Sequence, residues 1–201
     1  MAGDPVASNG PRGIASSAVE FNARLRSARK RLDLKVFLCG AAIERHNPPP
    51  PESRDAALRY RIMQLLVESG CEVILGEDAE FYHAARDVLK AKVTYAHHEL
   101  LLAARHADVT VVFPCSAGSF AELGMFAAAA EITRKLIVVI DDQDEYREGY
   151  IANGPALMAE YEGTAVEFLP YENVDAVWGF LLPRLDAVAM RRIKDEIFTG
   201  R

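Results

Sequence analysis

The chain has 201 residues, half of them hydrophobic, and a formal net charge of −6. This length and composition exclude a disordered chain and allow one domain with a substantial core. The acidic balance argues against nucleic acid as the main ligand, although a local basic patch stays compatible with it.

The sequence shows neither an apolar run long enough to cross a bilayer nor the pattern of a signal peptide, so we expect a cytoplasmic protein outside the membrane. The spacing of its three cysteines, Cys39, Cys71 and Cys115, matches neither a disulfide framework nor a zinc site. Cys39 and Cys115 fall at the ends of predicted strands. There they either line a site or serve as small buried apolar side chains.

The predicted elements begin with a flexible tail over residues 1–14 and a helix within residues 15–34, followed by one α/β domain over residues 35–201. Short apolar runs predict five buried strands, with helical patterns between them and an acidic loop over residues 141–149. The strands are expected at residues 35–40, 71–76, 108–114, 135–140 and 164–169, and the helices at 53–69, 79–106, 120–134, 151–162 and 174–197.

Strands that alternate with helices indicate a doubly wound, five-stranded parallel sheet with helices on both faces, a flavodoxin-like or Rossmann-like fold of order 2-1-3-4-5. In this order the switch point of the sheet lies between the first and third strands, and ligands bind beyond the carboxyl ends of the strands. The two loops that meet there are residues 40–52, which include four consecutive prolines, and residues 113–119.

The second of these loops leads into a helix through the sequence Cys115-Ser-Ala-Gly-Ser-Phe-Ala-Glu-Leu-Gly124. Small residues before a helix let backbone N–H groups approach a phosphate or a ribose hydroxyl, and Ser116 and Ser119 add hydroxyl groups. Glu122 follows Ser119 by three residues, which is also the spacing of a capping box. The other interpretation is that the helix dipole keeps Glu122 ionised, so that it can attack an anomeric carbon.

Two segments carry a family resemblance. The runs DVTVVF at residues 108–113 and SAGSFAELGMFA at residues 116–127 resemble the nucleoside 2-deoxyribosyltransferase family. The resemblance implies that Glu122 is the nucleophile that forms a covalent glycosyl-enzyme. It also implies that Ser116, Gly118 and Ser119 hold the 5′ end of the sugar or its phosphate.

A second resemblance, over residues 35–170, is to retron-associated effectors with a deoxyribosyltransferase-like fold. It implies an effector of bacterial anti-phage defence, with a retron reverse transcriptase/DNA complex as a candidate partner. The residues that carry it are VFLCG at 36–40, Ser53-Arg54-Asp55, Arg59, the Ala-Glu-Leu-Gly-x-Phe core, and YIANGP at 150–155.

Residues at other strand ends complete the predicted site. Cys39 and Gly40 end the first strand, and Asp141 ends the fourth, where it either holds a ribose or caps the next turn. By resemblance, Asn153 reaches the site of a neighbouring subunit, which implies a homo-oligomer; the same Asn-Gly-Pro is also an ordinary turn before a helix. The resemblance also allows Glu99 to point toward the site.

Arg45, Arg54 and Arg59 lie near the first loop, where each either contacts a phosphate or faces solvent. Neighbouring His97 and His98 do not share a helix face, so a metal site there is not expected.

The chain departs from the transferases at two places. Phe37 and Cys39 stand where many of them carry a tyrosine, and Pro114-Cys115 stands where many carry an aspartate. The general acid is therefore unassigned, and a nucleotide or a dinucleotide such as NAD suits the turn better than a free nucleoside. We predict an N-glycosidase or N-glycosyltransferase that uses Glu122 and needs no metal or other cofactor. The alternative is a nucleotide-binding sensor or regulatory subunit without turnover, in which Glu122 is only a cap.

Overall fold

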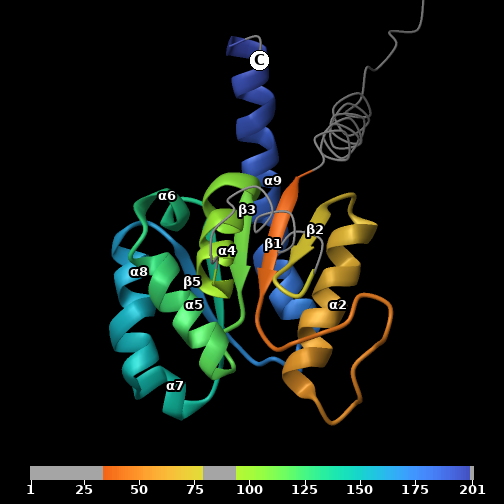
Figure 1. Ribbon diagram of the computed structural model, residues 1–201, viewed down its shortest axis with the longest axis vertical. Helices are drawn as coiled ribbons and strands as arrows, with labels where there is room; N and C mark the ends of the chain where they lie inside the picture. The colour runs from red at the N-terminus through yellow and green to blue at the C-terminus, as the bar shows by residue number, and fades with distance from the viewer. Residues whose placement is uncertain (1–33, 79–93, 200–201) are drawn as a thin grey trace, which may run out of the picture.

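The computed structural model describes residues 34–78 and 94–199. These residues form a five-stranded parallel sheet of order β2-β1-β3-β4-β5, which confirms the predicted doubly wound α/β fold (Figure 1). The helix expected within residues 15–34, the tail before it and the first part of the helix expected from residue 79 lie outside the described residues. The strands are β1 (Lys35–Cys39), β2 (Glu72–Leu75), β3 (Val109–Val112), β4 (Leu136–Asp141) and β5 (Ala165–Leu169).

Helices connect the strands in the predicted alternation, with two differences. A short helix occupies part of the acidic segment that was expected to be a loop, and the helix after β3 ends at residue 127, with a separate helical turn after it. Two segments, η1 and η2, are π-helical turns. The helical elements are α2 (Arg54–Glu68), α4 (Tyr95–Leu101), η1 (Leu102–His106), α5 (Ala117–Ala127), α6 (Ala130–Thr133), α7 (Asp144–Glu148), η2 (Ala152–Ala156), α8 (Leu157–Tyr161) and α9 (Val174–Thr199).

The sheet carries an apolar core on each face. Helices α2 and α9 cover one face, where Ile62 and Leu181 pack against Val111. Elements η1, α5, η2 and α8 cover the other face, where the rings of Phe37 and Phe126 meet edge to face with 6.3 Å between their centroids. Strands β1, β3 and β4 are therefore buried on both sides, which explains why their sequences are almost continuously apolar.

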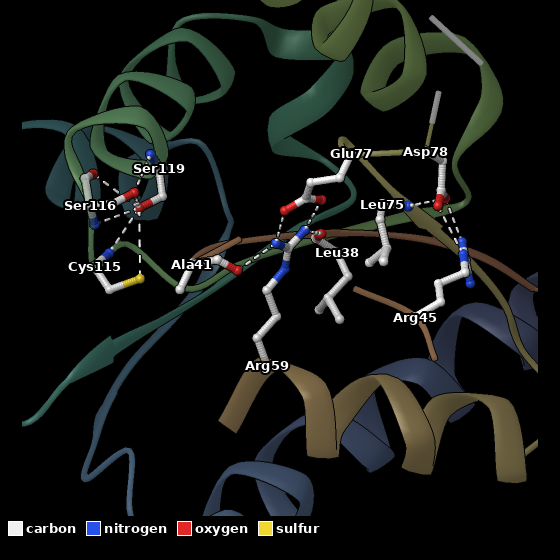
Figure 2. A network of polar contacts seen from close by, with 10 residues as sticks. All are labelled: Leu38, Ala41, Arg45, Arg59, Leu75, Glu77, Asp78, Cys115, Ser116 and Ser119. Carbon is white, nitrogen blue, oxygen red and sulfur yellow. Dashed lines mark hydrogen bonds and ion pairs between the residues drawn. The ribbon is translucent and has the colours of Figure 1, made fainter. Parts of the chain in front are cut away.

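Strand β2 lies at one edge of the sheet, and two side chains bind its outward backbone groups (Figure 2). Arg45 donates to the carbonyl of Val73 at 2.5 Å, and the carboxylate of Asp78 accepts the N–H of Leu75 at 2.9 Å. Arg45 and Asp78 also form an ion pair with each other. The first loop of the predicted site is thereby fixed to the β2 edge.

Helix α9 is longer than the sheet that it covers. Its side chains at Val177, Leu181, Leu185 and Ala189 are buried at a spacing of four residues, and its last turns project away from the sheet (Figure 1). Within residues 34–78 and 94–199, no helix has the length and apolar composition that a membrane crossing requires.

Candidate active site

The carboxyl ends of β1 and β3 lie side by side at the switch point, as predicted. The N–H of Phe113 donates to the carbonyl of Cys39 at 3.0 Å, and Gly40 then turns the chain with a φ of +151°. A Cβ on Gly40 would lie 3.2 Å from the carbonyl oxygen of Phe113 and 3.3 Å from Cδ of Arg59. Position 40 therefore requires glycine both for its backbone conformation and for the close approach of these neighbours.

The buried side chain of Ser119 stabilises the turn after β3 through hydrogen bonds to its backbone (Figure 2). Its Oγ accepts the N–H groups of Cys115 and Ser116, both at 2.9 Å, and Ser116 Oγ accepts the N–H of Ser119 at 3.3 Å. Ser116 is thus the N-cap of α5, and the capping box links Ser116 with Ser119. The expected capping box between Ser119 and Glu122 is wrong, because the helix begins three residues earlier than the sequence pattern indicated.

The outer part of this turn is open to solvent. Ser116, Ala117 and Gly118 are exposed, whereas Ser119 is buried. The N–H groups of Ala117 and Gly118 lie in the first turn of α5, at the positive end of the helix dipole. Because Ser119 already binds the N–H groups of the two preceding residues, a bound sugar or phosphate would be held by Ala117 and Gly118 and by the hydroxyl of Ser116.

Glu122 lies in the second turn of α5 and is hydrogen bonded to Glu99 of α4. Its Oε2 is buried and has no hydrogen-bond partner among the described residues. Burial, and after it the charge of Glu99, raise the pKa of Glu122 from its ordinary 4.5 to about 7. Burial and the second carboxyl group thus act against the helix dipole, which was expected to keep Glu122 ionised, and with a pKa of about 7 Glu122 is about half protonated at pH 7.

Glu99 is positioned by α4, the helix that precedes η1 and β3 in the chain. Thr94 caps α4 by accepting the N–H of His97 at 3.3 Å, and Glu99 Oε1 would lie 3.0 Å from a Cβ on Gly76. Burial raises the pKa of Glu99, while its hydrogen bond to Glu122 lowers it. The two carboxyl groups therefore titrate as a coupled pair, and each keeps its proton to a higher pH than an exposed glutamate does.

Cys39 completes the cluster from the end of β1. Cys39 is 2% exposed, and its thiol lies near enough to Glu122 for each group to affect the pKa of the other. Burial, followed by the charge of Glu122, raises the pKa of the thiol well above its ordinary value, so Cys39 stays protonated. Cys39 is thus a buried side chain that also faces the candidate nucleophile, and its contact with a substrate stays a prediction.

Asp141 is engaged within the protein. One of its carboxylate oxygens accepts the N–H of Tyr171 at 3.1 Å, and the other accepts hydrogen bonds from Arg54 and Gln143. Its side chain is buried, so both oxygens already have donors. These contacts fix the loop after β4, and a role for Asp141 in holding ribose stays a prediction.

Asn153 lies on the surface, in the π-helical turn η2. Its side-chain amide donates to the carbonyls of Glu148 and Gly149, at 3.2 and 3.1 Å. This arrangement joins α7 to η2 and agrees with the local interpretation of Asn-Gly-Pro as a turn before a helix. Its predicted reach into a neighbouring subunit stays a prediction.

Arg59 is the residue whose place in the structure differs most from expectation. It was interpreted as a phosphate contact or a solvated side chain, yet it is 2% exposed and forms an ion pair with Glu77. A signal for its burial was present in the sequence. Arg59 precedes Ile62, Met63 and Leu66 by three, four and seven residues, which places it on the apolar face of α2.

Within the described part of the chain, no group of three or more His, Cys, Asp and Glu side chains is arranged so that it could hold a metal ion. His97 is exposed, with its Nδ1 2.9 Å from Thr94 Oγ1, whereas His98 is buried.

Comparison with known proteins identifies the family. Residues 54–198, well over half of the chain, match the protein family described as "STM3845 retron effector protein". The chain belongs to this family of retron effectors. The matched segment contains Arg59, Glu99 and Glu122, and it begins after β1 and so leaves out Cys39 and Gly40.

A relative of this retron effector in Escherichia coli is named "Retron Ec86 putative ribosyltransferase/DNA-binding protein". The two chains are 28% identical over 141 residues, which are 67% of this chain and 40% of the relative. The retron effector thus spans less than half the length of that relative. The predicted relation to retron effectors is confirmed, while the likeness to the deoxyribosyltransferase fold stays a prediction.

Proposed function

We propose that this retron effector cleaves the bond between a base and a sugar, as an N-glycosidase or N-glycosyltransferase acting on a nucleotide, a nucleoside or NAD. The observation that carries the proposal is the half-buried carboxyl pair of Glu99 and Glu122 at the switch point of the sheet. The name of the E. coli relative includes "ribosyltransferase", which supports chemistry at the anomeric carbon of a sugar. Membership of a retron effector family supports a role in anti-phage defence.

The carboxyl pair supplies both a nucleophile and a proton in this mechanism. Movement of the shared proton from Glu122 to Glu99 leaves Glu122 as a carboxylate. Glu122 then attacks the anomeric carbon and the bond to the base breaks. Glu99 donates its proton to a leaving purine or pyrimidine; with NAD, nicotinamide leaves as a neutral base and the proton of Glu99 passes to solvent instead. The general acid that sequence reasoning left unassigned is therefore Glu99.

The second half of the reaction regenerates the pair. The sugar is now an ester of Glu122, and water or the N–H of a second base attacks its anomeric carbon. Glu99 accepts the proton of the attacking group as the ester bond breaks, and Glu122 leaves as a carboxylate. One proton and one negative charge again reside on the pair, so the cycle balances.

The exposed N-terminus of α5 would bind the other end of the sugar. Ser116 and Gly118 lie on the same helix as Glu122, at its exposed start, so they can hold a 5′ hydroxyl or phosphate while the anomeric carbon reaches the carboxyl pair. Ser119 contributes by shaping the turn, since its hydroxyl is occupied by backbone N–H groups.

A product survey tests the proposal. Purified protein is incubated with NAD, ribonucleotides, deoxyribonucleotides and the corresponding nucleosides, and free base is measured by liquid chromatography. The wild type and a control variant at an exposed glutamate of α8, Glu160→Gln, are expected to release base, and Glu122→Gln is expected to release none. Full activity of Glu122→Gln would rule out its role as nucleophile.

The alternative function is a nucleotide-binding sensor or regulatory subunit without turnover. The observation in its favour is that the pKa of Glu122 is raised to about 7, so this carboxyl group is not fully ionised at neutral pH. A sensor would bind a nucleotide, measurable by calorimetry, and return it intact after long incubation.

We also propose a cytoplasmic assembly in which a homo-oligomer acts together with a retron reverse transcriptase/DNA complex. The support is the retron effector family and the words "DNA-binding" in the name of the relative. Light scattering after size-exclusion chromatography measures the number of subunits. Co-purification with the reverse transcriptase of the same retron, before and after nuclease treatment, tests for the complex.

A further inference from the structure

Arg59 joins three segments of the chain beneath the candidate site (Figure 2). Its Nη1 donates to the carbonyl of Ala41 at 2.6 Å, and its Nη2 donates to the carbonyl of Leu38 at 2.5 Å. The same two nitrogens bind the two carboxylate oxygens of Glu77, at 2.5 and 3.0 Å. One guanidinium thus fixes α2, the end of β1 and the loop after β2 relative to one another.

A buried charge of this kind is costly, so its position calls for an explanation beyond packing. Arg59 is 2% exposed, its Nε is buried without a hydrogen-bond partner in the described residues, and its ion pair with Glu77 is only partly shielded from solvent. A well-packed apolar side chain of similar volume would often be as stable or more stable at such a place. The face of α2 on which Arg59 lies is otherwise apolar.

The backbone that Arg59 holds is the backbone that carries Cys39. Leu38 and Ala41, its two carbonyl acceptors, flank Cys39 and Gly40. The Cys39 thiol and Glu122 affect each other's pKa, and a Cβ on Gly40 would lie 3.3 Å from Cδ of Arg59. The guanidinium therefore sets where the end of β1 meets the carboxyl pair.

The charges around the carboxyl pair come from four elements. The charge of Glu99, on α4, raises the pKa of Glu122. Arg59 of α2 and the Cys39 thiol of β1 lower the pKa of Glu122. Glu77, which follows β2, raises the pKa of Glu99. Arg59 is the described cation that acts on both members of the pair. Its charge favours the ionised form of each carboxyl group and so acts against burial and the neighbouring carboxyl groups, which raise both pKa values.

We infer that Arg59 is a positioning residue of the active site: its hydrogen bonds to the carbonyls of Leu38 and Ala41 hold the end of β1, and its buried guanidinium places a positive charge near the Glu99–Glu122 pair. This inference rests on the proposed function for its catalytic meaning. The placement of the charge and its effect on the pair can be measured whether or not the protein turns over a substrate.

Opposite substitutions in the Arg59–Glu77 pair provide the test. Arg59→Met removes the positive charge, and Glu77→Gln removes its negative partner and leaves Arg59 uncompensated. A matched control is Arg61→Met, which removes an exposed arginine of the same helix. The protonation midpoint of the carboxyl pair is followed by NMR of protein labelled with ¹³C at the glutamate carboxyl carbon, with Glu122→Gln used to assign the signal.

The expected midpoints move in opposite directions. Arg59→Met raises the midpoint by about one pH unit, because an opposite charge near a carboxyl group typically lowers its pKa by one to three units and Glu77 partly offsets this charge. Glu77→Gln lowers the midpoint, and Arg61→Met leaves it unchanged. Where the wild type releases base, the pH profile of base release shifts in the same direction as the midpoint in each variant.

The outcomes separate this inference from the proposed function. If the wild type releases no base but the midpoints shift as expected, the proposed function fails and the placement of charge by Arg59 stands. If base is released and the midpoints of Arg59→Met and Glu77→Gln equal that of the wild type, the inference is overturned. Should Arg59→Met not fold, Glu77→Gln decides alone, and a midpoint that is unchanged or higher in that variant overturns the inference.

Discussion

Substitution of Glu122 by glutamine should make the protein more stable at alkaline pH, even as it removes the proposed activity. The folded protein raises the pKa of Glu122 to about 7 from an ordinary value of 4.5. The folded state therefore binds a proton that the unfolded state has released, so stability falls as the pH rises from 4.5 to 7. At about 1.4 kcal/mol for each pKa unit, the loss above pH 7 is about 3 kcal/mol.

Glutamine has nearly the shape of a protonated glutamate and carries no charge, so Glu122→Gln should recover this stability. At pH 8 the expected gain of about 3 kcal/mol corresponds to a rise in Tm of roughly 6–12 °C for a chain of this size. At pH 5 the gain should shrink to below about 1 kcal/mol, because the wild-type carboxyl group is already protonated in the folded state.

Thermal unfolding followed by circular dichroism at a series of pH values between 5 and 8 measures this difference. Glu160→Gln serves as the control, since Glu160 is exposed on α8. An equal change in Tm at pH 5 and pH 8, or a lower Tm at pH 8, would refute the account of Glu122 as a buried carboxyl group with a raised pKa. The measurement is independent of any substrate.

Three further predictions address the Glu99–Glu122 carboxyl pair, the N-cap of α5 and a buried hydrogen bond of the core. Glu99→Gln should slow base release by at least about 100-fold, which is the usual contribution of a general acid, and the chromatographic assay measures this. The same substitution should lower the pKa of Glu122, because a neighbouring negative charge is gone, and the NMR titration measures that shift. Ser116→Ala should lower the unfolding free energy by about 1 kcal/mol through loss of the N-cap of α5, while Ser116→Gly should lower it by only a few tenths of a kcal/mol, both measured by urea denaturation. Tyr171→Phe removes a buried hydrogen bond of 2.8 Å to the carbonyl of Val139, and an equilibrium loss of about 1–3 kcal/mol is expected in the same assay.

The sheet was predictable from the sequence because its signals are local and repeated. Each central strand is a short apolar run that is buried on both faces, and the alternation with helices allows only a few connections. The order of the strands, their parallel direction and the switch point between β1 and β3 followed from these two features. The location of Glu122 on the helix after β3 followed as well.

The details of the site were less predictable, because they depend on residues far apart in the chain. The spacing from Ser119 to Glu122 fits a capping box, but the helix begins at Ala117, and only the backbone conformation at Ser116 distinguishes the two possibilities. The raised pKa of Glu122 depends first on burial and then on Glu99, which lies on another helix 23 residues earlier in the chain. No local sequence pattern predicts which carboxyl groups the fold brings close together.

The position of β2 at the edge of the sheet affects how copies of this protein can associate. An edge strand with unpaired backbone groups is a template on which a strand from another molecule can add. In this protein Arg45 binds the outward carbonyl of Val73, and Asp78 binds the outward N–H of Leu75. An incoming strand would have to displace both side chains and break their ion pair before it could bind, so this edge resists sheet-to-sheet aggregation.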